Sequence, residues 1–364
     1  MKNNFLSPIK EIIKDAKLGK LFILVDDKDR ENEGDLVVAA SKCNYKKINF
    51  MITHGRGLVC LALTKKKVNE LGLPLMSSIN KSRMQTAFTV SIESKRGITT
   101  GISAFDRAKT IKTAINVRAK KSDIVSPGHV FPLVSRDGGV LERAGHTEAS
   151  VDIVKLAKLN PSAVICEVMN QDGRMARIKD LVKFSKKHNI KIASISDLIA
   201  YRFKNEKLIT NTLNSRFHTK EFKNCEIKTY KNNFNNLNSV VIKKGILSKS
   251  SIAPVRVLST NLNKKNFIND IKIVKSLKFL NKNNKFVLIL IQDKKSIKEK
   301  IVEETSKSNI LRYYGFGAQI IKDLGLKKII LVSSSLKKII GLEGYGIKII
   351  KQKIIKLKKR KFSL

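Results

Sequence analysis

Cysteine is scarce in this sequence, and long apolar runs are absent. The 364 residues include only Cys43, Cys60, Cys166 and Cys225, and these form no Cys-x-x-Cys pair. The sequence therefore predicts no disulfide framework, and a reducing cytoplasm is the natural compartment. The longest apolar runs, such as residues 286–291, are far too short to span a bilayer. The first residues lack a signal-peptide pattern, so we expect neither export nor a membrane anchor.

Acidic residues are also few, which makes their one dense cluster informative. The chain has 30 Asp and Glu against 73 Lys and Arg, a formal net charge of +43. Residues 26–35 nevertheless hold six carboxylates, directly after the apolar run 21–25. Carboxylates so close together repel one another unless a cation or a basic group offsets them. The cluster is either a solvated surface turn or a ligand site at the carboxyl end of a strand.

The excess of positive charge is spread along the chain. Only residues 351–361 form a dense basic run, and a solvated terminus is the ordinary interpretation of such a run. A nucleic-acid-binding protein usually gathers its basic residues on one face or stripe. We therefore do not expect nucleic-acid binding as the main role.

Length and periodicity predict two α/β domains. The hydrophobic content of 42% suffices for packed cores, and 364 residues would stretch a single one. A first helix is expected between Ser7, as its cap, and Gly19. Further elements alternate along the chain: strands at 21–25, 58–63, 88–92 and 163–169, and helices at 103–115, 147–159 and 180–188.

This alternation predicts a mixed sheet covered by helices in residues 1–203. Residues 204–250 are polar, rich in Asn and Lys, and show few periodic elements, so they are expected to be a linker followed by the irregular start of a second domain. Residues 251–364 again alternate apolar strands with helical stretches, which predicts a second, smaller α/β domain.

Two loops in the first domain carry groups that a fold alone does not require. Residues 126–132 and 138–148 are rich in glycine or proline and contain His129, Arg143 and His146. The second loop enters a helix at Thr147, and the N-terminus of a helix suits a phosphate. Arg143 could grip that phosphate, and His146 could be a metal ligand or a proton carrier. Capping or packing roles for the two histidines remain open.

A Gly-rich basic turn and one carboxylate complete the candidate site. Residues 52–60 place Gly55, Arg56 and Gly57 before a strand, which permits close approach of an anion but also fits an ordinary tight turn. Glu167 shares a strand face with apolar neighbours. A carboxylate there is costly unless it is paired, metal-bound or protonated. A general acid or base and a salt bridge at the strand end both remain open.

Together, these groups indicate a divalent-metal site for a small phosphorylated substrate. Hard oxygen ligands with one imidazole favour Mg²⁺ or Mn²⁺ over zinc.

The same segments, in this order, closely resemble the 3,4-dihydroxy-2-butanone 4-phosphate synthases of riboflavin biosynthesis over residues 6–203. The resemblance rests on Asp26–Asp35, His54–Cys60, Gly97–Ser103, Pro127–Pro132, Arg143–Glu148 and Glu167. It implies a lyase that converts D-ribulose 5-phosphate into 3,4-dihydroxy-2-butanone 4-phosphate and formate with Mg²⁺, as a homodimer with sites near the subunit interface.

The resemblance also implies roles for individual residues. Glu31 and His146 would hold the metal, and His129 and Glu167 would transfer protons, with Glu33 and Cys60 lining the same site. The residues implied in substrate binding are Arg30, Glu31, Asp35, Arg143, Ala144, Gly145, His146, Thr147 and Glu167, with Arg143 and Thr147 near the phosphate.

The second domain resembles GTP cyclohydrolase II in the fragments Leu311–Ile321 and Gly341–Gly346. That family holds zinc with three cysteines near its first strand, where this chain has residues 255–262 without cysteine, and its catalytic segment appears here as Ile291–Ser296. We therefore expect a degenerate domain with no zinc and no cyclohydrolase activity. The alternatives are a bifunctional enzyme and a non-catalytic regulatory or scaffolding module.

Overall fold

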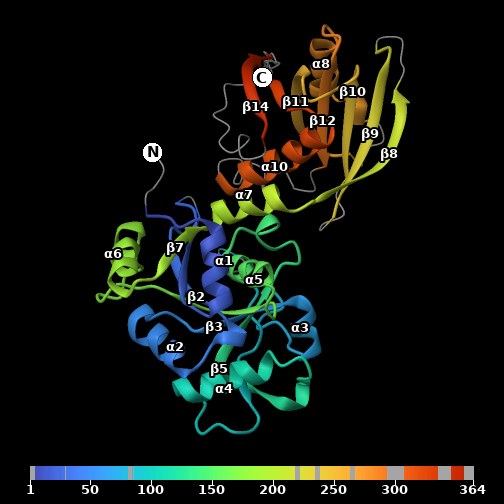
Figure 1. Ribbon diagram of the computed structural model, residues 1–364. Helices are drawn as coiled ribbons and strands as arrows, with labels where there is room; N and C mark the ends of the chain where they lie inside the picture. The colour runs from blue at the N-terminus through green and yellow to red at the C-terminus, as the bar shows by residue number, and fades with distance from the viewer. Residues whose placement is uncertain are drawn as a thin grey trace, which may run out of the picture. The chain divides into compact units, whose positions relative to one another are not determined.

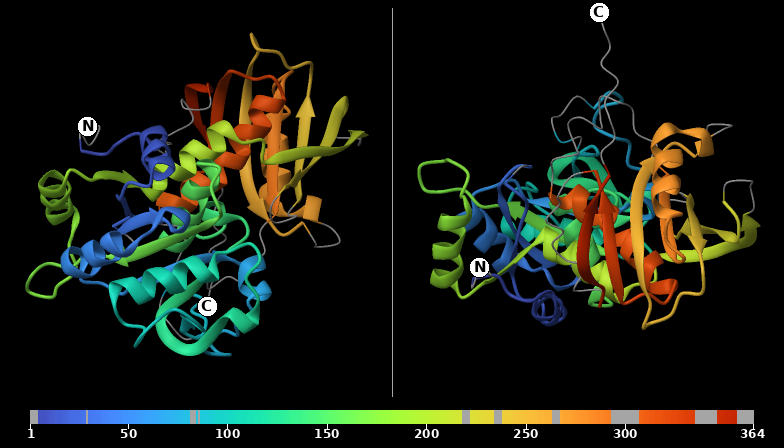
Figure 2. Two further views of the ribbon diagram at one scale, coloured as in Figure 1. Left: turned by 60° about the horizontal axis from the view of Figure 1, so that its bottom comes forward. Right: turned by 90° about the horizontal axis from the view of Figure 1, so that it is seen from above.

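The computed structural model of the protein describes residues 5–28, 30–80, 84, 86–217, 222–233, 238–262, 267–292, 307–334 and 346–355. The chain divides into two compact units, Met1–Ile199 and Ala200–Leu364 (Figures 1 and 2). Within the described residues, no helix is both long and apolar enough to cross a membrane.

The first unit is a mixed sheet covered by helices, as predicted. In the described residues its seven strands lie in the order β4-β5-β3-β6-β2-β1-β7. The strands are β1 (Phe22–Val25), β2 (Gly34–Ala39), β3 (Cys60–Thr64), β4 (Ile92–Ser94), β5 (Ile124–Ser135), β6 (Ser162–Glu167) and β7 (Lys191–Ser194). The helices are α1 (Ile9–Leu18), α2 (Tyr45–Phe50), α3 (Lys65–Glu70), α4 (Ala104–Ala114), α5 (His146–Leu156) and α6 (Ile178–His188).

Helices cover both faces of this sheet. On one face, α5 packs against the central strands β2, β3 and β6 and against α1 (Figure 1). On the other face, Ile48 of α2, Ile111 of α4 and Leu181 of α6 share one apolar core with alternate residues of the strands. The central strands are buried on both faces, which explains why they appear in the sequence as continuous apolar runs.

Two local expectations in the first unit are wrong. Ser7 does not cap α1: the residue before the helix is Pro8, and no side chain caps it. The Ser7 N–H instead donates to the Ile192 carbonyl (2.7 Å), which ties the segment to β7. The expected loop 126–132 lies within strand β5, where Gly128 fits against the backbone of Ile92 in β4. Gly19 does end α1, in the left-handed conformation (φ 74°).

The second unit is also a mixed sheet between helices. In the described residues its seven strands lie in the order β14-β13-β11-β12-β10-β9-β8. Helix α7 (Ile195–Asn205) leads from the first unit into the second. The other elements are β8 (Ile209–Phe217), β9 (Cys225–Asn232), β10 (Asn238–Lys244), β11 (Ile252–Thr260), α8 (Ile271–Leu280), β12 (Phe286–Gln292), α10 (Lys307–Asp323), β13 (Lys328–Ser333) and β14 (Lys348–Ile354). Helix α8 covers one face of the sheet and α10 the other.

Residues 204–250 belong to the second unit, as the predicted start of a second domain requires, but they are not the expected linker or irregular chain. Strands β8, β9 and β10 occupy most of it and pair antiparallel as one end of the second sheet. These strands are held by cross-strand pairing and by single buried residues such as Tyr230, whose hydroxyl donates to Asp323 (2.8 Å). Most of their other side chains are polar, which hid the alternation expected of a strand.

Candidate active site

The acidic cluster lies where three strands and a helix of the first unit meet. Strand β1 ends at Val25, directly before the cluster, and β6 ends at Glu167. Pairing of β2 with β6 sets Asp35 opposite Glu167. Helix α5 begins at His146 and packs against strands β1, β2 and β6. The fold therefore gathers groups from residues 26–35, 146 and 167, as the sequence predicts.

Asp26 organises the acidic loop. Its carboxylate, 1% exposed, accepts hydrogen bonds from the backbone N–H of Glu33 (2.9 Å) and of Glu31 (3.1 Å), and from Arg30 Nη1 (2.8 Å). Arg30 also contacts the Glu31 carboxylate. From the other side, Arg177 Nη1 donates to the Glu31 carbonyl (2.8 Å). The loop is thus held in one conformation by these hydrogen bonds and is not a solvated turn. Asp29 lies outside the described residues.

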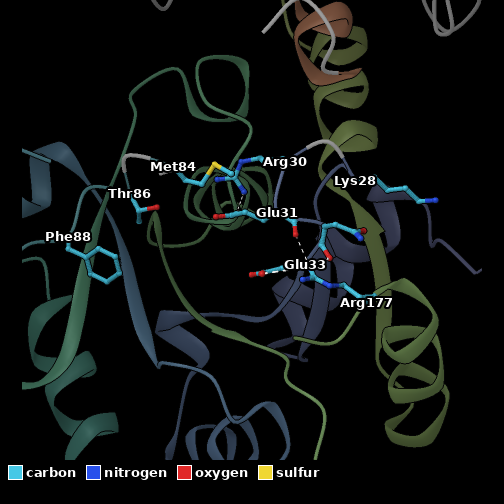
Figure 3. A pocket seen from close by; sticks show the side chains of 9 residues that line it. Lys28, Arg30, Glu31, Glu33, Met84, Thr86, Phe88 and Arg177 are labelled. Atoms are coloured by element: carbon cyan, nitrogen blue, oxygen red, sulfur yellow. Dashed lines mark hydrogen bonds and ion pairs between the residues drawn. The ribbon is translucent and has the colours of Figure 1, made fainter. Parts of the chain in front are cut away.

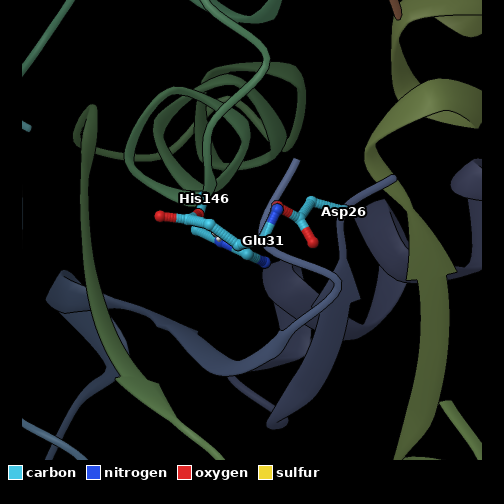
Figure 4. Close-up of side chains that lie close together, drawn as sticks. All are labelled: Asp26, Glu31 and His146. Atoms are coloured by element: carbon cyan, nitrogen blue, oxygen red, sulfur yellow. Dashed lines mark hydrogen bonds and ion pairs between the residues drawn. The ribbon is translucent and has the colours of Figure 1, made fainter. Parts of the chain in front are cut away.

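Asp26, Glu31 and His146 form a group that can hold a metal ion (Figure 4). One ligand atom from each lies within 4.8 Å of the other two. The His146 Nδ1 is 3.9 Å from Glu31 Oε2 and 3.8 Å from Asp35 Oδ1. Its Nε2 is buried with no hydrogen-bond partner among the described residues. The nitrogen that faces the carboxylates of Glu31 and Asp35, and is therefore placed to bind a shared metal ion, is Nδ1.

The protonation of His146 suits a ligand. Burial, more than any other effect, lowers its pKa to about 4, so the imidazole is neutral at ordinary pH and can donate a lone pair. Two carboxylates and one imidazole are a fitting set for a hard divalent cation. The predicted pair Glu31 and His146 is thus brought together. Asp26, to which the resemblance assigns no role, is within reach of the same ion.

Asp35 and Glu167 are the carboxyls best placed to carry a proton. Both are largely buried, and burial is the main cause that raises the pKa of each. For Asp35 the next cause is the neighbouring charge of Glu167. The Leu58 N–H donates to Glu167 Oε2 (2.9 Å) and fixes its position. Burial also raises the pKa of Glu33, followed by repulsion from Glu31. Such carboxyls can act as general acids or bases near neutral pH.

An open cavity of about 670 Å³ is lined by Glu31 and Glu33 of the acidic loop (Figure 3). Its charged walls are Lys28, Arg30, Glu31, Glu33 and Arg177. A cavity with three cationic and two anionic side chains suits a polar substrate that carries a negative charge. Arg177 was not expected here, because it lies 146 residues from Glu31 in the sequence.

Arg143 is fixed by partners at the start of α5. Its Nη1 donates to Glu148 (2.6 Å), and its Nη2 donates to the Met84 carbonyl and the Thr86 hydroxyl (3.0 Å each). Glu148 is 1% exposed, so this pair is largely shielded from water. Gly145 is needed beside it, because a Cβ there would lie 2.3 Å from Arg143 Nη1. Ala144 and Thr147, the remaining predicted residues of this segment, are buried around the helix start.

His129 and Cys60 occupy neighbouring strands. Cys60 is buried on β3, and burial, followed by the charges of Glu167 and Asp35, raises its thiol pKa. A raised pKa keeps the thiol protonated, and a protonated thiol is a weak nucleophile. Phe131 of β5 pairs with Cys60, and His129 stands two residues before Phe131 on the same strand. The half-exposed His129 ring pairs with Glu93 of β4, a partner that sequence reasoning missed.

These observations define the class of the protein: an α/β protein with a carboxylate–histidine group that can hold a metal ion. The sequence pattern of the 3,4-dihydroxy-2-butanone 4-phosphate synthase family matches residues 10–201, and that of GTP cyclohydrolase II matches residues 210–353. The chain belongs to the 3,4-dihydroxy-2-butanone 4-phosphate synthase family, fused to a GTP cyclohydrolase II domain.

Relatives of the same length share both parts. The riboflavin biosynthesis protein RibBA of Aquifex aeolicus is 44% identical over 96% of this chain and 92% of its own. The 3,4-dihydroxy-2-butanone 4-phosphate synthase of Photobacterium phosphoreum is 41% identical over 95% of this chain and 98% of its own. The crystal structure of RibBX from A. baumannii, a two-domain synthase, superposes with a TM-score of 0.82 at 38% identity, covering 96% of this chain and 99% of that one.

Proposed function

We propose that the first unit converts D-ribulose 5-phosphate into 3,4-dihydroxy-2-butanone 4-phosphate and formate. The observation that carries this proposal is the meeting of the acidic loop, His146 and Glu167 in a chain of this family. The reaction is a lyase step of riboflavin biosynthesis.

Mg²⁺ is the proposed cofactor, held by Glu31 and His146 with Asp26 in reach. A structure of a synthase in complex with two magnesium ions superposes on 55% of this chain, with a TM-score of 0.53 at 37% identity. When bound, a divalent cation stabilises negative charge that develops on substrate oxygens. The same ligands would accept Mn²⁺.

The side chains of the site have separate proposed roles in proton transfer and substrate positioning. Glu167, held by the Leu58 N–H and with a raised pKa, accepts or returns a proton beside the substrate carbonyl. Arg30 and Asp35 position the substrate hydroxyls, and Glu33 lines the cavity that admits it.

The substrate phosphate is assigned to the start of α5. Arg143 is preset there by Glu148, and Thr147 with the backbone of Ala144 and Gly145 offers further donors at a helix N-terminus.

His129 is proposed as a second proton-transfer group, with Cys60 lining the site. His129 is half-exposed on β5, beside Glu93 of β4. The resemblance to the synthase family carries the proposed state, a homodimer with sites near the subunit interface. The absence of paired cysteines supports a reducing cytoplasm as its location.

Two substitutions test the assignment. Glu167→Gln and His129→Ala are expected to keep the fold, as judged by circular dichroism and thermal unfolding, and to abolish formate release from ribulose 5-phosphate. Near-normal turnover in either variant contradicts the role given to that residue.

For the second unit we propose a degenerate GTP cyclohydrolase II domain without activity. The last cysteine is Cys225 and the unit has one histidine, His218, so the three thiolates that the family uses for zinc are missing. Residues 293–296 and 341–345, in the fragments compared with that family, lie outside the described residues. Zinc-dependent formate release from GTP would refute the proposal and make the enzyme bifunctional.

A further inference from the structure

A second cavity lies on the face of the first sheet opposite α5. It measures about 340 Å³, which is within the range of small-ligand pockets. Its walls come from the π-helical turn Met51–Gly55, from the residues that follow β6, and from α6. Short π-helical segments often mark functional sites. None of the roles proposed above uses this cavity.

Aromatic rings form one wall. The His54 and His188 rings are 4.7 Å apart between centroids and tilted by 44°, and Phe184 packs on His188 at 4.5 Å with a tilt of 43°. Phe50 packs against both histidines, at 4.7 and 5.1 Å. Because the rings are tilted against one another by 43° to 90°, His54, His188 and Phe184 offer ring edges and faces for a planar ring to pack against. Phe50 lies behind the two imidazoles.

Positive charge surrounds the rings. Arg56, Lys183 and Lys187 line the cavity, and in the described part of the chain none of them forms an ion pair. Asp180, the carboxylate of the lining, already accepts hydrogen bonds from the Arg177 N–H (3.0 Å) and from Asn170 (3.4 Å). Asp180 offsets part of the charge of Lys183. This leaves Arg56 and Lys187 as the other cations of the lining that can attract an anion, and a phosphate fits arginine and lysine donors.

Arg56 is held ready for such an anion. It adopts the left-handed conformation (φ 69°), which is uncommon for a residue with a side chain. Its Nη1 donates to the carbonyls of His54 (3.0 Å) and Met169 (3.1 Å). The guanidinium has five N–H donors, so those on Nε and Nη2 remain for a ligand.

The same turn touches the first site. The Met169 N–H donates to the Gly55 carbonyl (2.8 Å), and Leu58, two residues after Arg56, donates to Glu167. A Cβ on Gly57 would lie 2.6 Å from Glu167, so the turn and that carboxyl cannot shift independently.

We propose that this second cavity binds a phosphate ester that carries a planar ring, and that its occupancy changes the position of Glu167. The first half stands on the cavity alone. The second half rests on the proposed function of Glu167.

The binding test uses calorimetry with the full chain and three probes: adenosine 5′-monophosphate, adenosine and inorganic phosphate. The monophosphate should bind at least about tenfold more tightly than either fragment, since each loses the phosphate or the ring contacts. Lys183→Gln/Lys187→Gln should weaken its binding by about tenfold or more. The matched control, Lys179→Gln/Lys186→Gln, removes the same charge from α6 outside the cavity.

Several results overturn the proposal. Equal affinity for adenosine and its monophosphate excludes the phosphate contact, and equal effects of the two double variants exclude this cavity as the location. Saturating monophosphate should also change kcat for formate release in the wild type but not in the Lys183→Gln/Lys187→Gln variant. An unchanged kcat with confirmed binding rejects the coupling. Absence of any formate release rejects the proposed function and leaves the binding result standing.

Discussion

The contact between Gly57 and Glu167 allows a sharp test of the proposed acid–base carboxyl. Replacing Gly57 with alanine adds one methyl group beside the site and removes no functional group. The φ of Gly57 lies outside the left-handed region, so alanine adopts this backbone without strain. Any effect therefore comes from the new contact.

The structure sets the size of that effect. A Cβ at position 57 would lie 2.6 Å from both the carbonyl oxygen and Oε2 of Glu167, and 2.7 Å from its backbone nitrogen. Ordinary contact begins at 3.4 Å, so the two segments must move apart by about 0.8 Å. A displacement of roughly 1 Å in a reacting group costs about 10²-fold in rate. Overpacking of this kind costs about 1–3 kcal/mol in the free energy of unfolding.

The assay is steady-state formate release together with urea unfolding. Gly57→Ala should lower kcat by about two orders of magnitude while the protein remains folded. Gly317→Ala in α10 is the control, because among the described residues a Cβ there meets only Val257, at 3.4 Å, and it should leave kcat unchanged. A Gly57→Ala enzyme with kcat within about threefold of the wild type would refute the reasoning, since Glu167 would then tolerate displacement.

Three further outcomes are expected. Glu148→Gln should raise KM for ribulose 5-phosphate by about tenfold with little change in kcat, because Arg143 loses a charged hydrogen bond; an unchanged KM would show that Arg143 acts without it. Burial raises the pKa of Asp35 and Glu167. The metal-free folded state therefore keeps protons that the unfolded state releases above about pH 4. The free energy of unfolding consequently falls as the pH rises through the raised pKa values. Mg²⁺ favours the ionised carboxylates, so the rise in Tm on adding Mg²⁺ should be larger at about pH 8 than at about pH 6, and equal rises would contradict this. Tyr230→Phe removes a hydrogen bond in the second unit and should lower the free energy of unfolding by about 1 kcal/mol without changing formate release; a loss of activity would show that the synthase depends on this unit.

The sequence was most informative where local signals and burial agree. The strand before the acidic loop, the helix that begins at His146 and the strand that ends at Glu167 are all present, because a strand buried on both faces and a helix start have clear local patterns. Strands β8 to β10 have no such pattern. Their pairing is decided by partners along the sheet rather than by their own composition.

Site residues whose partners lie far away in the sequence could not be predicted from local sequence patterns either. Arg177 and Glu93 reach the acidic loop and His129 only after the chain folds, and nothing in their own neighbourhoods marks them. Glu148 did have a signal, since it stands five residues after Arg143 at a helix start, but its role depends on a burial that the sequence does not display.

The central claim is that Asp26, Glu31 and His146 hold the divalent ion of a ribulose 5-phosphate lyase. The most direct measurement is formate release during a Mg²⁺ titration of EDTA-treated enzyme, for the wild type and for Glu31→Gln. The account predicts no release without metal, recovery on adding Mg²⁺, and a requirement for at least about tenfold more Mg²⁺ in the variant. Formate release that persists in EDTA, or a Mg²⁺ dependence that is the same in both proteins, would contradict it.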